Sequence, residues 1–123
     1  LLSRIWPALK LQFDIDPKDL WLEDCFLVKY ESDGQAGLAP HQDDSELSFN
    51  LLLSDADSFE GGGTRFADAE PEEVTLQPAC GEMITHYGGV FHEGAKIVSG
   101  GPRYILAGFV RARPLGEKWR ELI

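Results

Sequence analysis

The close spacing of turn residues after residue 25 is the feature that most constrains the fold. Short stretches that alternate apolar and polar residues are separated there by turns rich in Gly and Pro. The clearest are CFLVKYE (25–31), with Phe26, Val28 and Tyr30 on one face, ELSFNLLLS (46–54) and RYILAGFVR (103–111); EEVTLQP (72–78), GEMITHY (81–87) and FHEGAKIV (91–98) are expected as further strands. No segment between them is long enough for the crossover helix that parallel strands require. The sequence therefore predicts a mainly β, antiparallel domain of seven or eight short strands, a sandwich or jelly roll.

The two ends of the chain differ from this pattern. The first 22 residues contain Trp6-Pro7 and Asp16-Pro17 followed by KDLWLED, which predict one or two short helices packed on the main body. The segment PLGEKWRELI (114–123) predicts a short helix or tail anchored by Trp119. A chain of 123 residues can build one hydrophobic core, so we expect a single domain over 1–123 with its core at about 25–111.

Charge and hydropathy narrow the class of protein. The formal net charge is −10, from 21 acidic and 11 basic residues. A nucleic-acid partner is not expected, because phosphate contacts favour the opposite balance. A membrane span is not expected either, because no apolar run approaches the roughly 18 to 20 residues that cross a bilayer. The acidity suits a small molecule or a neutral or basic peptide, although solubility alone is an alternative explanation.

The remaining general features are less informative. The chain begins LLSRIWP, without Met or a signal segment, which predicts an excised domain or a processed fragment. Cys25 and Cys80 lack the spacing of a metal-binding CxxC pair, and two buried free thiols are expected rather than a disulfide. Neither the compartment nor the oligomeric state follows from these features.

The segment PHQDDSELSFN places His41 and Asp43 two residues apart, just before a predicted strand. Side chains at i and i+2 of an extended segment point to the same side, so both can face one metal ion. The chain has three histidines, which leaves His86 and His92 as candidates for a third ligand; His92 alone has an Arg close behind it, Arg103. A surface turn in which Asp43 caps a backbone amide is the alternative interpretation.

Two histidines and one carboxylate with open positions are the ligand set of non-haem Fe(II) oxygenases. In such enzymes that use 2-oxoglutarate, the co-substrate chelates the iron at one end and needs a fixed cation for its far carboxylate. Arg103 offers a planar, two-pronged donor for a carboxylate. It shares a strand face with Ile105, Ala107 and Phe109, so it would lie at the mouth of an apolar pocket. A surface salt bridge is the alternative role for Arg103.

Three segments, FLVKYESDGQAGLAPHQDDSELSFNLLLS, FEGGGTRF and HEGAKIVSGGPRYILAGFV, resemble the catalytic domain of the 2-oxoglutarate- and Fe(II)-dependent prolyl and lysyl hydroxylases. The likeness to procollagen lysyl hydroxylases is the greatest, and it covers about residues 26–110. It implies a double-stranded β-helix in which His41, Asp43 and His92 hold iron and Arg103 anchors 2-oxoglutarate.

The same resemblance assigns Tyr30 and Asn50 to holding 2-oxoglutarate. Tyr30 could instead be a core aromatic on an alternating strand, and Asn50 is a polar residue on an inward face that needs a partner. The expected cofactors are Fe(II), 2-oxoglutarate and O2, with ascorbate as a further candidate. No separate general acid or base is implied.

The expected function is hydroxylation of a prolyl or lysyl side chain in a peptide or protein, with succinate and CO2 as co-products. One alternative is a nucleic-acid dealkylase on the same site, which the net charge disfavours. The other is a non-catalytic metal-binding or interaction module on a jelly-roll scaffold, which has no need of Arg103. The loops between Asn50 and the triple glycine, and between His86 and His92, differ in length from the family and leave the hydroxylated residue open.

Two further motifs have simpler interpretations. Gly61, Gly62 and Gly63 predict a backbone bend rather than a phosphate cradle, because no Lys or helix follows them. Asp44 and Glu46 predict a solvated acidic rim, which could attract a cationic substrate.

Overall fold

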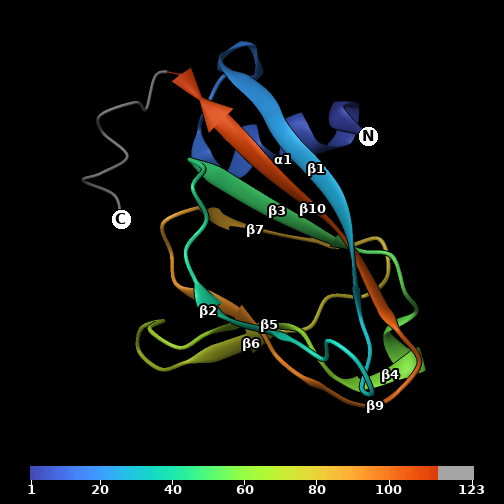
Figure 1. Ribbon diagram of the computed structural model, residues 1–123. Coiled ribbons are helices and arrows are strands. Elements are labelled where there is room, and N and C mark those ends of the chain that lie inside the picture. The colour runs from blue at the N-terminus through green and yellow to red at the C-terminus, as the bar shows by residue number, and fades with distance from the viewer. Residues whose placement is uncertain (114–123) are drawn as a thin grey trace.

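The computed structural model describes residues 1–113 (Figure 1). The predicted C-terminal helix or tail with Trp119 lies outside the described residues. An N-terminal helix, α1 (Leu2–Phe13), and a 3-10 turn, η1 (Pro17–Asp19), come first. The strands are β1 (Leu20–Tyr30), β2 (Leu38–His41), β3 (Leu47–Leu52), β4 (Phe59–Gly61), β5 (Thr64–Phe66), β6 (Val74–Leu76), β7 (Met83–Tyr87), β8 (His92–Gly94), β9 (Ile97–Gly100) and β10 (Arg103–Ala112), with a second 3-10 turn, η2 (Ala56–Ser58), before β4.

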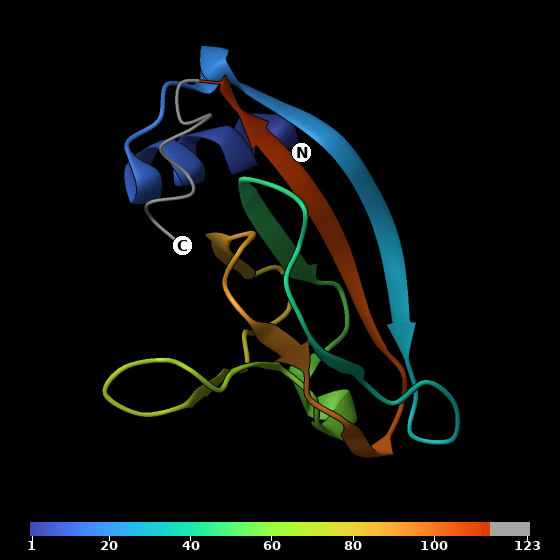
Figure 2. The same ribbon diagram turned by 60° about the vertical axis from the view of Figure 1, so that its left-hand side comes forward.

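The strands form two facing antiparallel sheets. The major sheet has the order β1-β10-β3-β7 and the minor sheet the order β2-β8-β5-β6, while β4 pairs with β9. The chain passes back and forth between the two sheets, from β2 to β3, β5, β7, β8 and β10, and so winds as a double-stranded β-helix. Figure 2 shows the major sheet along one side of the molecule and the minor sheet on the other. The prediction of a mainly β jelly roll with N-terminal helical support is confirmed.

The two faces of the major sheet pack against different partners. Leu47 and Phe49 of β3 and Val110 of β10 are buried in one cluster with Ile5 and Leu9 of α1. The two α1 residues are four positions apart, so they share one face of the helix. Side chains alternate along a strand, so the intervening residues of β3 and β10 face the minor sheet and line the interior of the molecule.

The first strand begins earlier than the sequence predicted. Residues from Leu20 to Asp24, expected in a short helix, belong to β1, and only Pro17–Asp19 form a helical turn. Leu20 pairs with Ala112 at the far end of β10, and the pairing continues to Tyr30 with one irregularity after Leu22. This ladder joins residues that are 92 positions apart at one end (Leu20 and Ala112) and 73 at the other (Tyr30 and Arg103), so the local sequence does not reveal it.

A second difference concerns the segment FHEGAKIV, expected as one strand. It forms β8 in the minor sheet and β9, which pairs with β4. The backbone between them bonds elsewhere: the Ala95 amide donates to the Gly63 carbonyl (3.0 Å) and the Ile97 amide to the Ala36 carbonyl (2.9 Å). The predicted bend at the triple glycine is confirmed, since Gly61, Gly62 and Gly63 have φ of 80°, 73° and 91°.

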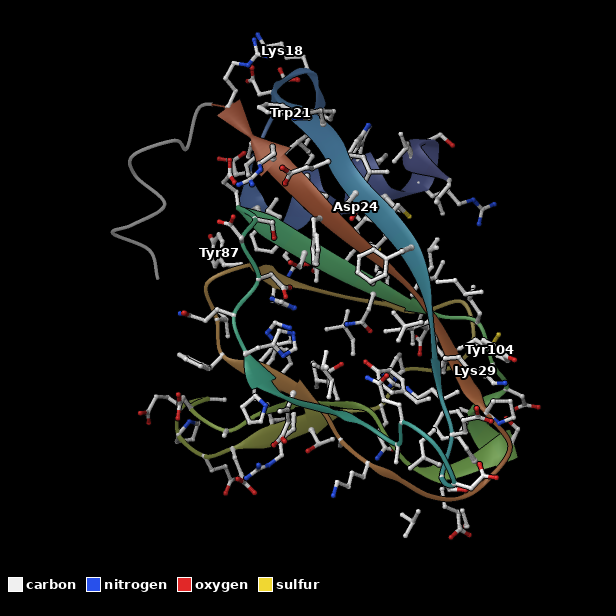
Figure 3. The ribbon with its side chains drawn as sticks, viewed as in Figure 1. Lys18, Trp21, Asp24, Lys29, Tyr87 and Tyr104 are labelled. Carbon is white, nitrogen blue, oxygen red and sulfur yellow. The ribbon has the colours of Figure 1, made fainter. Side chains whose placement is uncertain are left out.

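Several remaining features complete the fold. Beyond α1, the outer face of the major sheet is open to solvent, and Lys29 and Tyr104 lie side by side on it (Figure 3).

Both cysteines are free as expected, but neither is fully buried: Cys25 is half-buried and Cys80 is exposed. Within residues 1–113, no helix has both the length and the apolar character needed to cross a membrane.

Candidate metal centre

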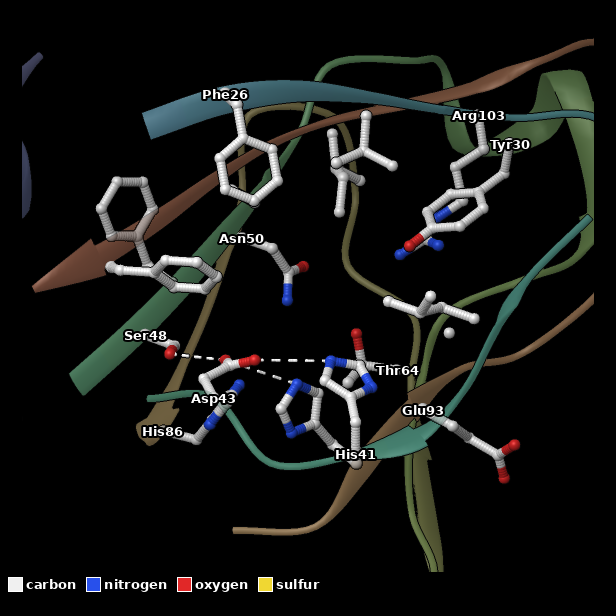
Figure 4. Close-up of a pocket in the computed structure, with 18 residues that line it drawn as sticks. Phe26, Tyr30, His41, Asp43, Ser48, Asn50, Thr64, His86, Glu93 and Arg103 are labelled. Carbon is white, nitrogen blue, oxygen red and sulfur yellow. Dashed lines mark hydrogen bonds and ion pairs between the residues drawn. The ribbon is translucent and has the colours of Figure 1, made fainter. Parts of the chain in front are cut away.

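A pocket of about 110 Å³ lies between the two sheets (Figure 4). The major sheet contributes one face of β1 and one face of β10, while the minor sheet contributes both ends of β2 and the whole of β8. The residues predicted to share those faces all line the pocket: Phe26, Val28 and Tyr30 of β1, and Arg103, Ile105, Ala107 and Phe109 of β10. One end of the pocket holds histidines and a carboxylate, and the other end holds an arginine.

His41, Asp43 and His92 meet at the first end. His41 ends β2, Asp43 follows in the loop, and His92 begins β8; His41 and His92 are direct partners in the β2–β8 ladder. Nε2 of His41 is 3.4 Å from Oδ1 of Asp43, and Nε2 of His92 is 3.5 Å from Oδ2. One ligand atom of each residue lies within 4.8 Å of the other two, so the three could hold a metal ion.

The hydrogen bonds of both imidazoles suit metal binding. Nδ1 of His41 is 2.7 Å from the Ala39 carbonyl, and Nδ1 of His92 is 2.8 Å from the Val90 carbonyl. A carbonyl only accepts, so each Nδ1 carries a proton, and in the tautomer that this selects Nε2 is the nitrogen with a lone pair for a metal ion. Backbone carbonyls orient metal-binding histidines in this way. The donor set of two imidazole nitrogens and one carboxylate fits non-haem iron.

Asp43 is held by its backbone and by its side chain. Its amide donates to the Gly88 carbonyl (2.7 Å), and its Oδ2 accepts a hydrogen bond from the Ser48 hydroxyl (2.6 Å). The sequence analysis missed Ser48. The residue lies two positions before Asn50 on the same face of β3, so a search for polar residues at alternate strand positions would have found it.

His86, the rival third ligand, lies beside this group rather than in it. It is on β7, 8% exposed, with its ring centroid 4.3 Å from that of His92. Its Nδ1 is 2.7 Å from the Tyr87 carbonyl, and the edge of Phe66 packs against its ring. Burial lowers the pKa of His86 below its ordinary value, which keeps the imidazole neutral.

At the opposite end of the pocket, Arg103 is a buried cation. It is 2% exposed, and its guanidinium carbon lies 5.3 Å from the centre of the Tyr30 ring. Across residues 1–113, no carboxylate lies within ion-pair distance of it. Burial lowers the pKa of Arg103 and raises that of Tyr30. A buried charge without a counter-ion is unfavourable, so this end of the pocket is suited to an anion.

The triple-glycine turn forms the wall behind Arg103. A Cβ on Gly62 would lie 3.2 Å from Cδ of Arg103 and 3.2 Å from the Phe59 ring, in addition to the strain of a positive φ. The turn therefore allows the guanidinium stem to lie close against the backbone.

Asn50 lies on the pocket wall between the two ends (Figure 4). Its Oδ1 is buried and has no hydrogen-bond partner among the described residues. Buried polar atoms are nearly always paired, so this unpaired amide oxygen on the pocket wall is suited to a water or a guest that donates a hydrogen bond.

The expected acidic rim is only partly present. Asp44 is exposed, as predicted. Glu46 is not a solvated rim residue: its side chain is 18% exposed and 2.7 Å from Nη1 of Arg111, which also pairs with Glu23 of β1. This ion network joins β10 to β1 and to the start of β3, so Glu46 has a structural contact that its sequence position did not reveal.

A jelly roll whose interior presents two histidines, one carboxylate and a buried guanidinium defines a class, the non-haem iron oxygenases. The chain belongs to the 2OG-Fe(II) oxygenase superfamily, whose sequence profile matches residues 22–112.

The alignments with curated relatives include most of this chain but less than half of each relative. It is 33% identical over 93 residues to a procollagen-lysine,2-oxoglutarate 5-dioxygenase of Drosophila melanogaster, a match over 69% of this chain and 12% of the relative. It is 33% identical over 104 residues to a PKHD-type hydroxylase of Maricaulis maris, over 79% of this chain and 46% of the relative. The chain thus spans about an eighth of the first relative's length and less than half of the second's.

Solved structures share the fold. A prolyl-4-hydroxylase of Pseudomonas putida superposes with a TM-score of 0.65 at 22% identity, over 91% of this chain and 63% of that one. A viral collagen prolyl hydroxylase from Paramecium bursaria Chlorella virus-1 gives 0.69 at 17% identity, over 90% and 70%. At these identities the likeness shows the jelly-roll architecture alone.

Proposed function

We propose that this chain is a single catalytic domain that uses Fe(II), 2-oxoglutarate and O2 to hydroxylate a prolyl or lysyl side chain of a peptide or protein. The observation that carries the proposal is the pairing of two features in one pocket. A three-residue metal-binding cluster lies at one end, and a buried arginine without a counter-ion lies at the other. A module that only bound metal would have no need of the second feature.

In this proposal His41, Asp43 and His92 hold the iron. When bound, the iron and 2-oxoglutarate supply oxidative decarboxylation, which yields succinate and CO2 and is coupled to hydroxylation of an unactivated C–H bond. The protein contributes the fixed imidazoles, whose Nδ1 protons are held by the Ala39 and Val90 carbonyls. These bonds hold each ring in the orientation in which its Nε2 lies close to the Asp43 carboxylate.

The co-substrate contacts follow from the rest of the pocket. Arg103 would pair with the far carboxylate of 2-oxoglutarate, which supplies the missing counter-ion. Tyr30, whose raised pKa keeps its phenol protonated, would donate a hydrogen bond to the same ligand. The Asn50 amide would donate through its NH2 group. Phe26 and Phe109, in edge-to-face contact with ring centres 5.4 Å apart, form an apolar part of the pocket wall.

The substrate class rests on the relatives. The relative from Drosophila melanogaster is named as acting on procollagen lysine, and the two structural neighbours are prolyl hydroxylases. A peptidyl substrate therefore has the most support, and the net charge of −10 is compatible with a basic peptide. Ascorbate is proposed as an accessory reductant on the basis of the family resemblance alone.

The test measures succinate from 2-oxoglutarate after anaerobic loading with Fe(II) and exposure to air. Prolyl peptides, lysyl peptides and methylated oligonucleotides are offered in parallel. We expect turnover with a peptide that disappears in Asp43→Ala. Arg103→Met should keep metal binding but weaken 2-oxoglutarate binding by roughly 100-fold or more, because two charge-assisted bonds of about 1.5–3 kcal/mol each are lost. Arg4→Met, at an exposed position on α1, is the matched control.

Three results would change the proposal. Turnover only with methylated oligonucleotides would make the domain a nucleic-acid dealkylase. Metal binding without turnover on any peptide would indicate a non-catalytic module. Unchanged 2-oxoglutarate affinity in Arg103→Met would remove the assigned role of that arginine.

A further inference from the structure

Two buried serines lie in series behind the carboxylate of the proposed metal site. The Ser45 and Ser48 hydroxyl oxygens are 2.9 Å apart, and the Ser48 hydroxyl is 2.6 Å from Oδ2 of Asp43. Ser45 is 9% exposed and Ser48 is 3% exposed, so both hydrogen bonds lie in the interior of the protein. Neither serine belongs to the metal-binding cluster itself.

The chemistry of these groups decides which atom donates and which accepts in each of the two hydrogen bonds. A carboxylate only accepts hydrogen bonds, so the single Ser48 proton must go to Asp43. The Ser45–Ser48 bond must then use the Ser45 proton, with the Ser48 oxygen as acceptor. Each bond polarises the next, and a length of 2.6 Å is in the range of charge-assisted O–H···O⁻ bonds.

The backbone around these serines is also fixed in place. Gly88, just after β7, accepts from the Asp43 amide (2.7 Å) and donates to the Glu46 carbonyl (3.1 Å). A Cβ at Gly88 would lie 2.0 Å from the Ser45 carbonyl oxygen and 2.7 Å from its hydroxyl oxygen. Only a glycine permits this approach, so the loop of residues 43–46 is held directly against the exit of β7.

We propose that Ser48, supported by Ser45, is a positioning residue that orients the Asp43 carboxylate for the metal ion. The terminal torsion of an aspartate is broad and otherwise poorly defined. A hydrogen bond to Oδ2 selects one orientation and engages one of its lone pairs, which leaves the remaining lone pairs of the carboxylate for the cation. This inference rests on the proposed metal site, and it adds the residue that connects the site to the major sheet through β3.

The test is equilibrium binding of Mn(II) and Co(II), measured by competition with a fluorescent chelator, with the visible Co(II) spectrum as a second readout. We expect Ser48→Ala to weaken metal binding by about 10- to 100-fold, the usual effect of removing a partner that orients a metal ligand. Ser48→Thr keeps the hydroxyl and should restore the affinity. Ser45→Ala leaves the Ser48–Asp43 bond in place and should have a smaller effect in the same direction.

A matched control and a second background separate positioning from general stability. Thr85→Val removes a hydroxyl from the neighbouring strand β7 that bonds Gln12 of α1 on the other face of the sheet, and it should leave metal affinity unchanged. In an Asp43→Ala background, Ser48→Ala should cause no further loss, because the serine acts only through that carboxylate.

Each outcome decides one proposal or both. Wild-type protein that binds neither metal overturns the metal site and this inference together. Wild-type binding with equal affinity in Ser48→Ala overturns the inference alone, as does an undiminished Ser48→Ala effect in the Asp43→Ala background. If Ser48→Ala does not fold, the inference is overturned when Ser45→Ala has the metal affinity and the Co(II) spectrum of the wild type.

Discussion

The two sheets that enclose the pocket are built differently. The major sheet has strands of up to 11 residues and is covered on one face by α1, with Leu47, Phe49 and Val110 almost fully buried. The strands of the minor sheet have three or four residues, and Val74 and Leu76 on its edge strand β6 are about two-fifths exposed. The minor sheet nevertheless carries His41 and His92, two of the three proposed ligands.

The two sheets therefore have different roles: the major sheet contributes most of the stability, and the minor sheet carries most of the proposed metal ligands. The major sheet has the buried apolar area that stabilises a fold, while the minor sheet has few apolar contacts of its own. The proposed iron would therefore tie a lightly packed sheet to a well-packed one, through Asp43 and its contact with β3. Changes in the major sheet should affect the whole protein, whereas changes in the minor sheet should remain local.

The largest effect is expected from Phe49→Ala in the major sheet. The ring is 2% exposed and lies against Gly108 of β10, where a Cβ would come within 2.1 Å of it. Loss of a buried phenylalanine lowers the free energy of unfolding by about 3–5 kcal/mol. Phe91→Ala, at a position that is 48% exposed, should change it by less than about 0.5 kcal/mol. Denaturant unfolding of the metal-free variants measures these changes. If the two variants lost equal free energy of unfolding, the stabilising core would not lie on the α1 side of the major sheet.

A smaller effect is expected from metal binding. Mn(II) at 100 times its dissociation constant should raise the free energy of unfolding by about 2.7 kcal/mol, provided it binds only the folded state. The added protection against amide hydrogen exchange should be greatest in β2 and β8, which carry His41 and His92. Asp43→Ala should show a much smaller gain. Protection spread evenly over both sheets would contradict a minor sheet that depends on the metal.

The smallest effect is expected from the ion pairs on the minor sheet. Arg65 of β5 pairs with Glu93 of β8 and with Glu73, and its side chain is 37% exposed. Exposed pairs contribute little, so Arg65→Gln should speed hydrogen exchange in β5 and β8 by roughly two- to fivefold without altering the major sheet. Glu73→Gln breaks only the contact outside the β5–β8 pair and should have less effect. A global loss of protection in Arg65→Gln would mean that the two sheets unfold as one unit.

Alternation along the strands made much of the pocket predictable. The alternate residues of two segments, expected to share a face, do line the interior: Phe26, Val28 and Tyr30 in one, and Arg103, Ile105, Ala107 and Phe109 in the other. This works because a strand with one buried face repeats every two residues, a pattern visible in any single segment. The extension of β1 to Leu20 and the division of FHEGAKIV into two strands were not predictable, because both depend on backbone partners far away in the chain.

The sequence by itself determined the fold class, the donor types of the site and the inward faces of its strands, since these follow from local periodicity and side-chain chemistry. The sequence favoured His92 over His86 only through a family resemblance and the nearby Arg103; the tertiary structure supplied the physical reason, because the β2–β8 ladder sets His92 directly opposite His41 and close to Asp43. It also decided that Arg103 has no carboxylate partner within residues 1–113, and that Ser48 bonds Asp43. Such contacts arise where distant strands meet, and no spacing along the chain specifies them.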